Sequence, residues 1–298
     1  MQRKLQLLII DPQNDFCDLP DNYLPANPLG EGALAPALPV PGAHADMLRV
    51  AALIEAGGDG LTGISVTLDA HHRIDIAHPA FWMDGARAAV APFTAITAAD
   101  VRAGRYQPRD GGAMPRTLAY LDALEAAGRY TLMVWPTHCE IGSWGQNVHA
   151  AVLAAYNGWE ERTQRSVYKV LKGSNPWTEH YSAIEAEVPD AADTATQANA
   201  ALLGELRGAE RLFIVGEAGS HCVKATTEHL VAHWDARELA RLVLVVDCMS
   251  PVSHFETQYA GFLRDMAARG VQLATAADVL PELLANATRT ANATGTAT

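Results

Sequence analysis

The chain has 298 residues, of which 49% are hydrophobic, so it is long enough to bury one large core. A net charge of −12 argues against a nucleic acid or an anionic membrane as the main partner, because both bind clustered Lys and Arg, and a small uncharged substrate fits better. Four cysteines without a CxxC pair indicate reduced thiols. The first apolar run ends at Asp11, too early for a signal peptide or a membrane span, so a cytoplasmic protein is expected.

Short apolar runs of strand length alternate with stretches of helix length along most of the chain. Strands are expected at residues 5–10, 63–67, 130–134, 166–170, 212–215, 242–246 and 271–274. Helices are expected near residues 44–56, 115–128, 146–156, 196–206, 223–234 and 255–269. This alternation predicts an α/β protein, a three-layer αβα sandwich with a mainly parallel sheet, which we interpret as one domain over residues 1–284.

Three segments depart from the alternation. Residues 17–43 carry six prolines, so this connection cannot be a helix or a central strand, and connections of that length are often lids. Residues 79–112 show little periodicity and are expected to form a surface insertion that covers part of the fold. Residues 285–298 are small, polar and low in complexity, and are predicted to be disordered.

Polar residues follow the expected strands at the points where those strands end. They are Asp11, Asp69, His71, His138, Lys172 and Cys222. Parallel strands bring their carboxyl ends to one edge of the sheet, where ligands bind in folds of this kind. Each residue alone has a simpler explanation, such as a turn for Asp11 or a solvated loop for Lys172. The recurrence at strand ends favours a functional site.

Cys222 lies where a strand passes through small residues into a helix. A thiol there faces the positive end of the helix dipole and unpaired backbone N–H groups, which lower its pKa and can hold an oxyanion. A neighbouring Asp could take the thiol proton, and a Lys would favour the thiolate, so Asp11, Lys172 and Cys222 form a reasonable acyl-transfer set. The alternative is a buried structural cysteine.

Asp69, His71 and His138 form a second candidate set. Oxygen and imidazole ligands with open positions for water are what a catalytic divalent metal requires. The alternative is a set of exposed loop histidines, since His72 and His78 lie nearby. A further pair, His229 and His233, has helical i, i+4 spacing but lacks the Glu of an HExxH motif, so we interpret it as structural.

Six segments resemble one known family in order. They are IIDPQNDFC (9–17), LPVPGA (38–43), TLDAHH (67–72), WPTHC (135–139), LKGSNPWTEHYSAI (171–184) and GEAGSHCV (216–223). On these motifs the chain resembles the isochorismatase-like cysteine hydrolases, most closely the nicotinamidases. The resemblance covers most of residues 4–275 apart from the two insertions. It implies a homo-oligomeric enzyme that cleaves a small amide to the acid and ammonia, with nicotinamide as the first candidate substrate.

The resemblance also implies roles for particular residues. Cys222 is the implied nucleophile, Asp11 the base that later acts as acid, and Lys172 the third member of the triad. The implied oxyanion hole is formed by the N–H groups of Ala218 and Cys222, after a cis peptide bond between Glu217 and Ala218. The implied metal ligands are Asp69, His71 and His138, which would hold zinc or else iron or manganese, and the implied aromatic walls are Phe16 and Trp135.

The chain departs from the family pattern near both sets. Where compact nicotinamidases have a further metal-binding His, this chain has Ala77, with His78 one residue on, so a fourth ligand is left open. Glu217 stands where an apolar residue is common and Ser220 where Asp is common.

Three other functions stay open. One is an amidase of the same superfamily that acts on a carbamoyl or maleamate-type amide. Another is isochorismatase action on an enol ether, which does not need the thiol of Cys222. The third is a non-catalytic ligand-binding or scaffold protein with the same fold.

Overall fold

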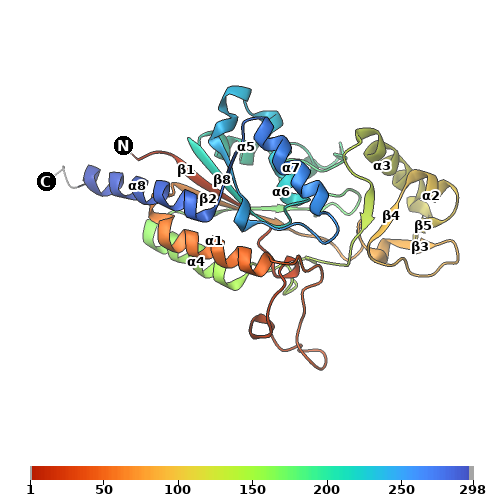
Figure 1. Cartoon of the computed structure of the whole chain (residues 1–298). Helices are drawn as coiled ribbons and strands as arrows, with labels where there is room; N and C mark the ends of the chain where they lie inside the picture. Colours follow the sequence, from red (N-terminus) through yellow and green to blue (C-terminus); the bar gives the residue numbers. More distant parts are fainter. Residues whose placement is uncertain (1, 295–298) are drawn as a thin grey trace.

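The computed structural model describes residues 2–294, with side chains to residue 289, and contains a six-stranded parallel sheet between two layers of helices (Figure 1). The strand order is β10-β9-β8-β1-β2-β7. The strands are β1 (Leu5–Ile10), β2 (Gly63–Asp69), β7 (Tyr168–Lys172), β8 (Arg211–Gly216), β9 (Leu242–Val245) and β10 (Gln272–Ala274). The predicted three-layer fold is confirmed.

The two central strands, β1 and β8, are buried on both faces, and strand pairing sets the register of the sheet. In β1 and β8 nearly every side chain is buried, because helices cover both faces, and the apolar runs are continuous as such strands require. Their register pairs Ile10 with Gly216. At the other side of β1, strand β2 pairs with β7 so that Asp69 lies opposite Lys172. Register alone therefore brings four strand ends to one edge.

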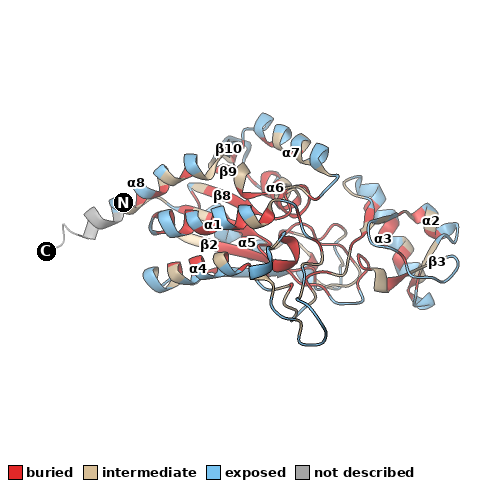
Figure 2. Cartoon of the chain, turned by 60° about the horizontal axis from the view of Figure 1, so that its bottom comes forward, coloured by how far each residue is buried: buried red, intermediate tan, exposed pale blue. Residues whose placement is uncertain are grey.

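Helices cover the two faces of the sheet in separate groups (Figures 1 and 2). One face carries α1 (Ala43–Gly57), α4 (Ala150–Thr163) and α8 (Ala276–Thr294). The other carries α5 (Ala200–Arg207), α6 (Cys222–His233) and α7 (Glu256–Ala268). Among the described residues, none of these helices combines the length and apolarity needed to cross a membrane.

The strand expected at residues 130–134 is not part of this sheet. Observed as β6 (Leu132–Val134), it pairs antiparallel with β4 (Thr94–Ile96). Its apolar side chains pack with α3 (Met114–Ala127) in a second apolar cluster, so they are buried away from the central sheet. The expectation that His138 follows a strand of the main sheet is therefore wrong.

The insertion at 79–112 is more ordered than expected. It contains β3 (Trp82–Asp84), β5 (Tyr106–Pro108) and α2 (Ala98–Arg102), and with α3 and β6 it forms a lobe beside the sheet (Figure 1). Burial of Trp82 and its apolar neighbours gives this lobe its own core. Because it has its own apolar core, the insertion is a folded lobe and not an irregular surface loop.

The other two irregular segments differ in outcome. The segment 17–43 contains no α-helix before α1 begins at Ala43, as its prolines predict, and it contains one 3-10 turn, η2 (Asp21–Tyr23). By contrast, residues 285–294, which were expected to be disordered, continue α8, while residues 295–298 lie outside the described part. The helix is held because the Asn286 side chain is buried and its Nδ2 donates to the carbonyl oxygen of Gly60 at 2.8 Å.

Candidate active site

Asp11, Lys172 and Cys222 meet in the structure at the carboxyl edge of the sheet. The Lys172 Nζ lies 2.9 Å from Asp11 Oδ2 and 3.6 Å from Cys222 Sγ. Lys172 also donates to the carbonyl oxygen of His180 at 3.0 Å, and its side chain is 1% exposed. The three residues come from β7, the end of β1 and the start of α6, as the strand-end argument predicts.

Asp11 is held in one orientation by its neighbours. Its Oδ1 accepts a 2.6 Å hydrogen bond from Thr67 Oγ1, and its backbone lies in the left-handed region with a φ of 44°. Burial raises the pKa of Asp11, while Lys172 opposes that shift. Asp11 is thus held in one orientation, in contact with the ammonium and within 4.8 Å of the thiol sulfur.

The thiol of Cys222 is protonated at rest, contrary to the expectation from the helix dipole. Cys222 begins α6 as predicted, but burial raises its pKa well above the ordinary value, the Lys172 charge opposes this, and Asp11 adds to it. Desolvation therefore outweighs the dipole. A carboxylate oxygen of Asp11 lies within 4.8 Å of the Cys222 sulfur, so Asp11 is the base next to the thiol.

The turn before Cys222 carries the implied oxyanion hole. The peptide bond between Glu217 and Ala218 is cis, as the resemblance implies. Within the described part of the chain, the backbone N–H groups of Ala218 and Cys222 have no hydrogen-bond acceptor. Both donors are therefore available to a developing oxyanion.

Asp69 joins the catalytic set to a cluster of histidines. Its Oδ1 lies 3.1 Å from Lys172 Nζ, and its Oδ2 lies 3.1 Å from His71 Nε2 and 3.6 Å from His138 Nε2. Burial by itself would raise the pKa of Asp69. His71 and Lys172 outweigh burial and hold this pKa well below its usual value. Asp69 is therefore an anion at the centre of the site.

His78, which the sequence left open as a fourth ligand, lies in this cluster. One ring nitrogen of each of His71, His78 and His138 lies within 4.8 Å of the others, and His78 Nε2 is 3.3 Å from His138 Nδ1. The neighbouring Ala77 donates its N–H to Asp75 Oδ1 in the turn that delivers His78.

The histidine rings are oriented by oxygen partners on their Nδ1 atoms. His71 Nδ1 lies 3.1 Å from Asp75 Oδ2, and His78 Nδ1 lies 3.2 Å from the carbonyl oxygen of His72. His138 Nδ1 lies 2.8 Å from the carbonyl oxygen of Pro136. This is how proteins orient imidazole ligands, and with the Asp69 carboxylate the donor set fits a divalent transition metal.

The cavity beside Cys222 is narrow and mostly aromatic. Phe16 and Trp135 line it as expected. Its lining also includes residues that sequence reasoning missed, namely Leu38, Glu179, Tyr181, His221 and Val252. Two of these had a signal in the sequence, because His221 directly precedes Cys222 and Tyr181 lies in the segment 171–184 that carries the resemblance.

The polar members of this lining differ in charge. Burial lowers the pKa of His221 to about 3, so this ring is neutral. Glu179 accepts a hydrogen bond from the His180 N–H at 3.0 Å on one oxygen, while its Oε2 is buried without a hydrogen-bond partner. The cavity therefore presents the anionic Asp69 and, in Glu179, a carboxyl oxygen without a hydrogen-bond partner among the described residues, beside the neutral His221 ring.

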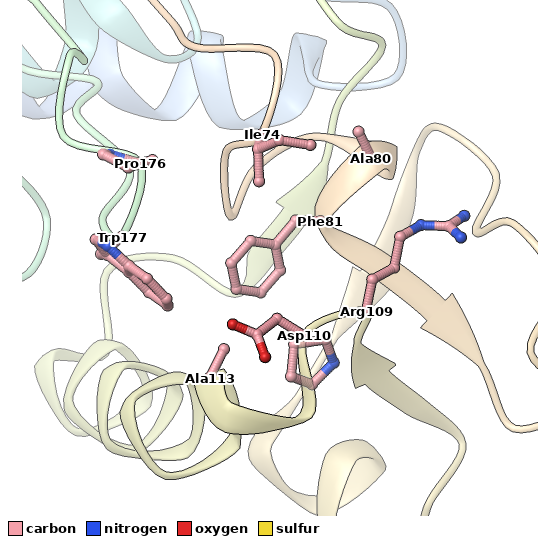
Figure 3. A pocket seen from close by; sticks show the side chains of 9 residues that line it. Ile74, Ala80, Phe81, Arg109, Asp110, Ala113, Pro176 and Trp177 are labelled. Carbon is pink, nitrogen blue, oxygen red and sulfur yellow. The ribbon is translucent and has the colours of Figure 1, made fainter.

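Chemistry, and not size, identifies this cavity as the site. Its free space is about 20 Å³, whereas a larger cavity, of about 390 Å³, lies between the inserted lobe and the loop after β7. Figure 3 shows that Phe81 and Trp177 face that larger space, while Arg109 points away from it. None of the residues that line it is a thiol, a histidine or a lysine.

The fold is that of the nicotinamidases and pyrazinamidases. The yeast nicotinamidase bound to the inhibitor nicotinaldehyde is similar with a TM-score of 0.59 and 18% sequence identity, over 91% of this chain and 99% of that one. An Acinetobacter baumanii nicotinamidase/pyrazinamidase gives 0.56 and 17%, over 93% and 99%. The Pyrococcus horikoshii pyrazinamidase in complex with zinc gives 0.50 and 18%, over 91% and 99%. No protein-family model and no curated protein matches the sequence.

Proposed function

We propose that this protein is a cysteine-dependent amidohydrolase that cleaves a small neutral amide to the carboxylic acid and ammonia, with nicotinamide as the first candidate substrate. The observation that carries the proposal is the buried contact of one ammonium, Lys172, with Asp11, Cys222 and Asp69. That contact gives a base, a nucleophile and a charge that stabilises the thiolate within a single site. The likeness to nicotinamidases supports the same choice of reaction.

The first half-reaction uses Asp11 and Cys222. Asp11 takes the thiol proton, and the sulfur attacks the amide carbonyl carbon while the N–H groups of Ala218 and Cys222 hold the oxyanion. Lys172 stabilises the thiolate before attack, which offsets the raised pKa of the buried thiol. Asp11 then gives its proton to the amide nitrogen, the C–N bond breaks, and ammonia leaves with a thioester formed on Cys222.

The second half-reaction reverses these roles. Asp11, now a carboxylate, takes a proton from water, whose oxygen attacks the thioester carbonyl. The C–S bond breaks, the acid is released, and the sulfur regains its proton. A divalent ion held by Asp69, His71, His78 and His138 would supply a Lewis acid next to this site and could orient the substrate.

The lining of the cavity favours a neutral aromatic amide over a maleamate-type substrate. Phe16, Trp135 and Tyr181 present flat apolar surfaces, which suit a planar ring. No Arg or Lys lines the cavity to pair with a substrate carboxylate, while the Asp69 anion would repel one. Retention of this complete catalytic set also argues against a non-catalytic binding role.

The test is ammonia release by the purified protein from nicotinamide, pyrazinamide and maleamate, with and without a chelator. Cys222→Ala is the catalytic control, and Cys248→Ala, a buried thiol away from the cavity, is the matched one. We expect release from the aromatic amides that Cys222→Ala abolishes and Cys248→Ala retains. Release from maleamate alone would overturn the choice of substrate, and release that survives Cys222→Ala would overturn the mechanism.

A further inference from the structure

Glu217, the residue before the oxyanion-hole donor Ala218, is a buried carboxyl group at the back of the active site. Its side chain is fully buried, although an apolar residue is common at this place in the resembling family. Its Oε2 accepts the Ser250 N–H at 3.2 Å, while its Oε1 accepts no hydrogen bond from any described donor. A buried carboxylate in that state would carry a large desolvation penalty.

The group facing Glu217 is a second buried carboxyl, Asp46 on α1. Asp46 is 2% exposed and lies next to Glu217, and Ser250 bridges the two carboxyl groups, because its N–H donates to Glu217 Oε2 and its Oγ donates to Asp46 Oδ2. Asp46 is charge-compensated, because Arg49 Nη2 lies 2.5 Å from its Oδ1 and Ser250 Oγ donates to its Oδ2 at 2.5 Å. Two carboxyl groups can hydrogen-bond only when one carries a proton. Since Asp46 has a cation and Glu217 has none, the proton belongs on Glu217.

The same contacts fasten the turn that carries the oxyanion hole. Gly219 donates its N–H to the carbonyl oxygen of Ser250 at 2.7 Å, and Val252 donates to Ser220 Oγ at 3.0 Å. Glu217 adds the link to α1 that these loop contacts do not make. The turn is therefore clamped from two directions, by the 250–252 loop and by α1.

We propose that Glu217 is a positioning residue, which, protonated and hydrogen-bonded to Asp46, holds the Ala218 N–H in place for the oxyanion. This inference rests on the proposed amidase function. Burial and the Asp46 charge also raise the pKa of Glu217 well above its usual value, in agreement with the geometry. Because this folded-state pKa is raised, the stabilisation by the pair is present at low pH and is lost as the pH rises through that pKa.

The other ionisable groups around Glu217 do not provide a cation for it. They are Cys17 and Asp18 after β1, Cys248 in η8 (Val246–Cys248), and Tyr259 on α7, with Arg49 beyond Asp46. Burial raises the pKa of the Cys17, Cys248 and Tyr259 groups, and the Glu217 charge raises each of them further. All three groups are therefore neutral near pH 7. Ionisation of Glu217 would therefore leave two adjacent buried anions with one cation, and the turn would have to open.

The test compares Glu217→Gln, which keeps the size and an N–H donor for Asp46, with Glu217→Leu, which removes the hydrogen bond. We expect Glu217→Leu to lower kcat at least about tenfold, toward the 10²–10³-fold effect of removing an oxyanion donor, with little change in KM. We expect wild-type kcat to fall at alkaline pH and Glu217→Gln to remove that fall. The control is Glu187→Gln, since Glu187 is a buried carboxyl elsewhere whose pKa is raised to about 7 by burial, and it should leave the alkaline fall unchanged.

A second readout does not depend on turnover. Infrared spectra of the wild type near neutral pH should contain a protonated-carboxyl C=O band that is absent in Glu217→Gln. A missing band, an alkaline fall retained in Glu217→Gln, or an unchanged kcat in Glu217→Leu would each overturn the inference. If the band is present but the wild type hydrolyses no amide, the proposed function fails and the protonated pair stands.

Discussion

Replacement of Lys172 by Met tests the electrostatics of the site most directly. The change keeps a long apolar stem but removes the ammonium that contacts Asp11 at 2.9 Å and Asp69 at 3.1 Å. Both carboxyl groups are buried and would lose their shared cation. Removing one partner of a buried ion pair costs about 3–5 kcal/mol in the free energy of unfolding. With an unfolding entropy of about 2.1 cal/mol/K per residue, the 298 residues give a fall in Tm of roughly 5–8 °C.

The pH dependence gives this prediction its sign. In the wild type the pKa of Asp69 is lowered, so Asp69 contributes stability above the unfolded value of about 3.9, and this is lost as the pH falls through the lower folded value. In Lys172→Met the pKa of both Asp11 and Asp69 must rise. The deficit relative to the wild type is therefore largest at neutral pH and shrinks toward about pH 4, where the carboxyl groups take up protons.

The assay is urea unfolding followed by Trp fluorescence, with a chelator present so that metal binding does not contribute. The matched control is Lys169→Met on the same strand, whose exposed Nζ lies 5.1 Å from the Tyr156 ring centroid and contributes at most about 1 kcal/mol. A deficit in Lys172→Met no larger than that of the control, or one that does not shrink in acid, would refute the reasoning.

Three further predictions concern the nucleophile and the metal cluster. Cys222→Ala should abolish ammonia release and leave the circular dichroism spectrum unchanged; residual turnover would exclude this thiol as the nucleophile. His78→Ala should weaken zinc binding in a chelator competition at least about tenfold, whereas His72→Ala, an exposed neighbour, should not, and equal affinities would remove His78 from the ligand set. Gly173→Ala should destabilise more than Gly128→Ala and also weaken zinc binding. Both glycines have positive φ, which costs about 1–2 kcal/mol for Ala. Only at Gly173 would the new Cβ lie 2.8 Å from a carboxylate oxygen of the cluster. Equal losses of stability in the two variants would contradict this packing.

The catalytic set could be predicted from the sequence because it depends on local patterns and one topological rule. Asp11, Asp69 and Lys172 each end or follow a buried apolar run, and Cys222 begins a helix after another. Parallel strands place such ends together whatever the loops do. For the same reason the α/β class and most element positions follow from periodicity.

Tertiary contacts decided the rest, because those features depend on partners far away in the sequence. Residues 130–134 have strand propensity, but only packing against the inserted lobe determines that β6 pairs with β4 and not with the main sheet. The low complexity around Asn286 suggested disorder, yet its bond to Gly60 fixes a helix.

The charge states at the site also required the three-dimensional structure. Helix position alone suggested a thiolate at Cys222, whereas burial, which is a property of the whole fold, keeps its proton. The protonation of Glu217 depends on Asp46, which lies 171 positions earlier in the chain. The sequence by itself determined which residues meet at the sheet edge, and the tertiary structure decided their solvation and partners, since desolvation and charge pairing exist only after the chain has folded.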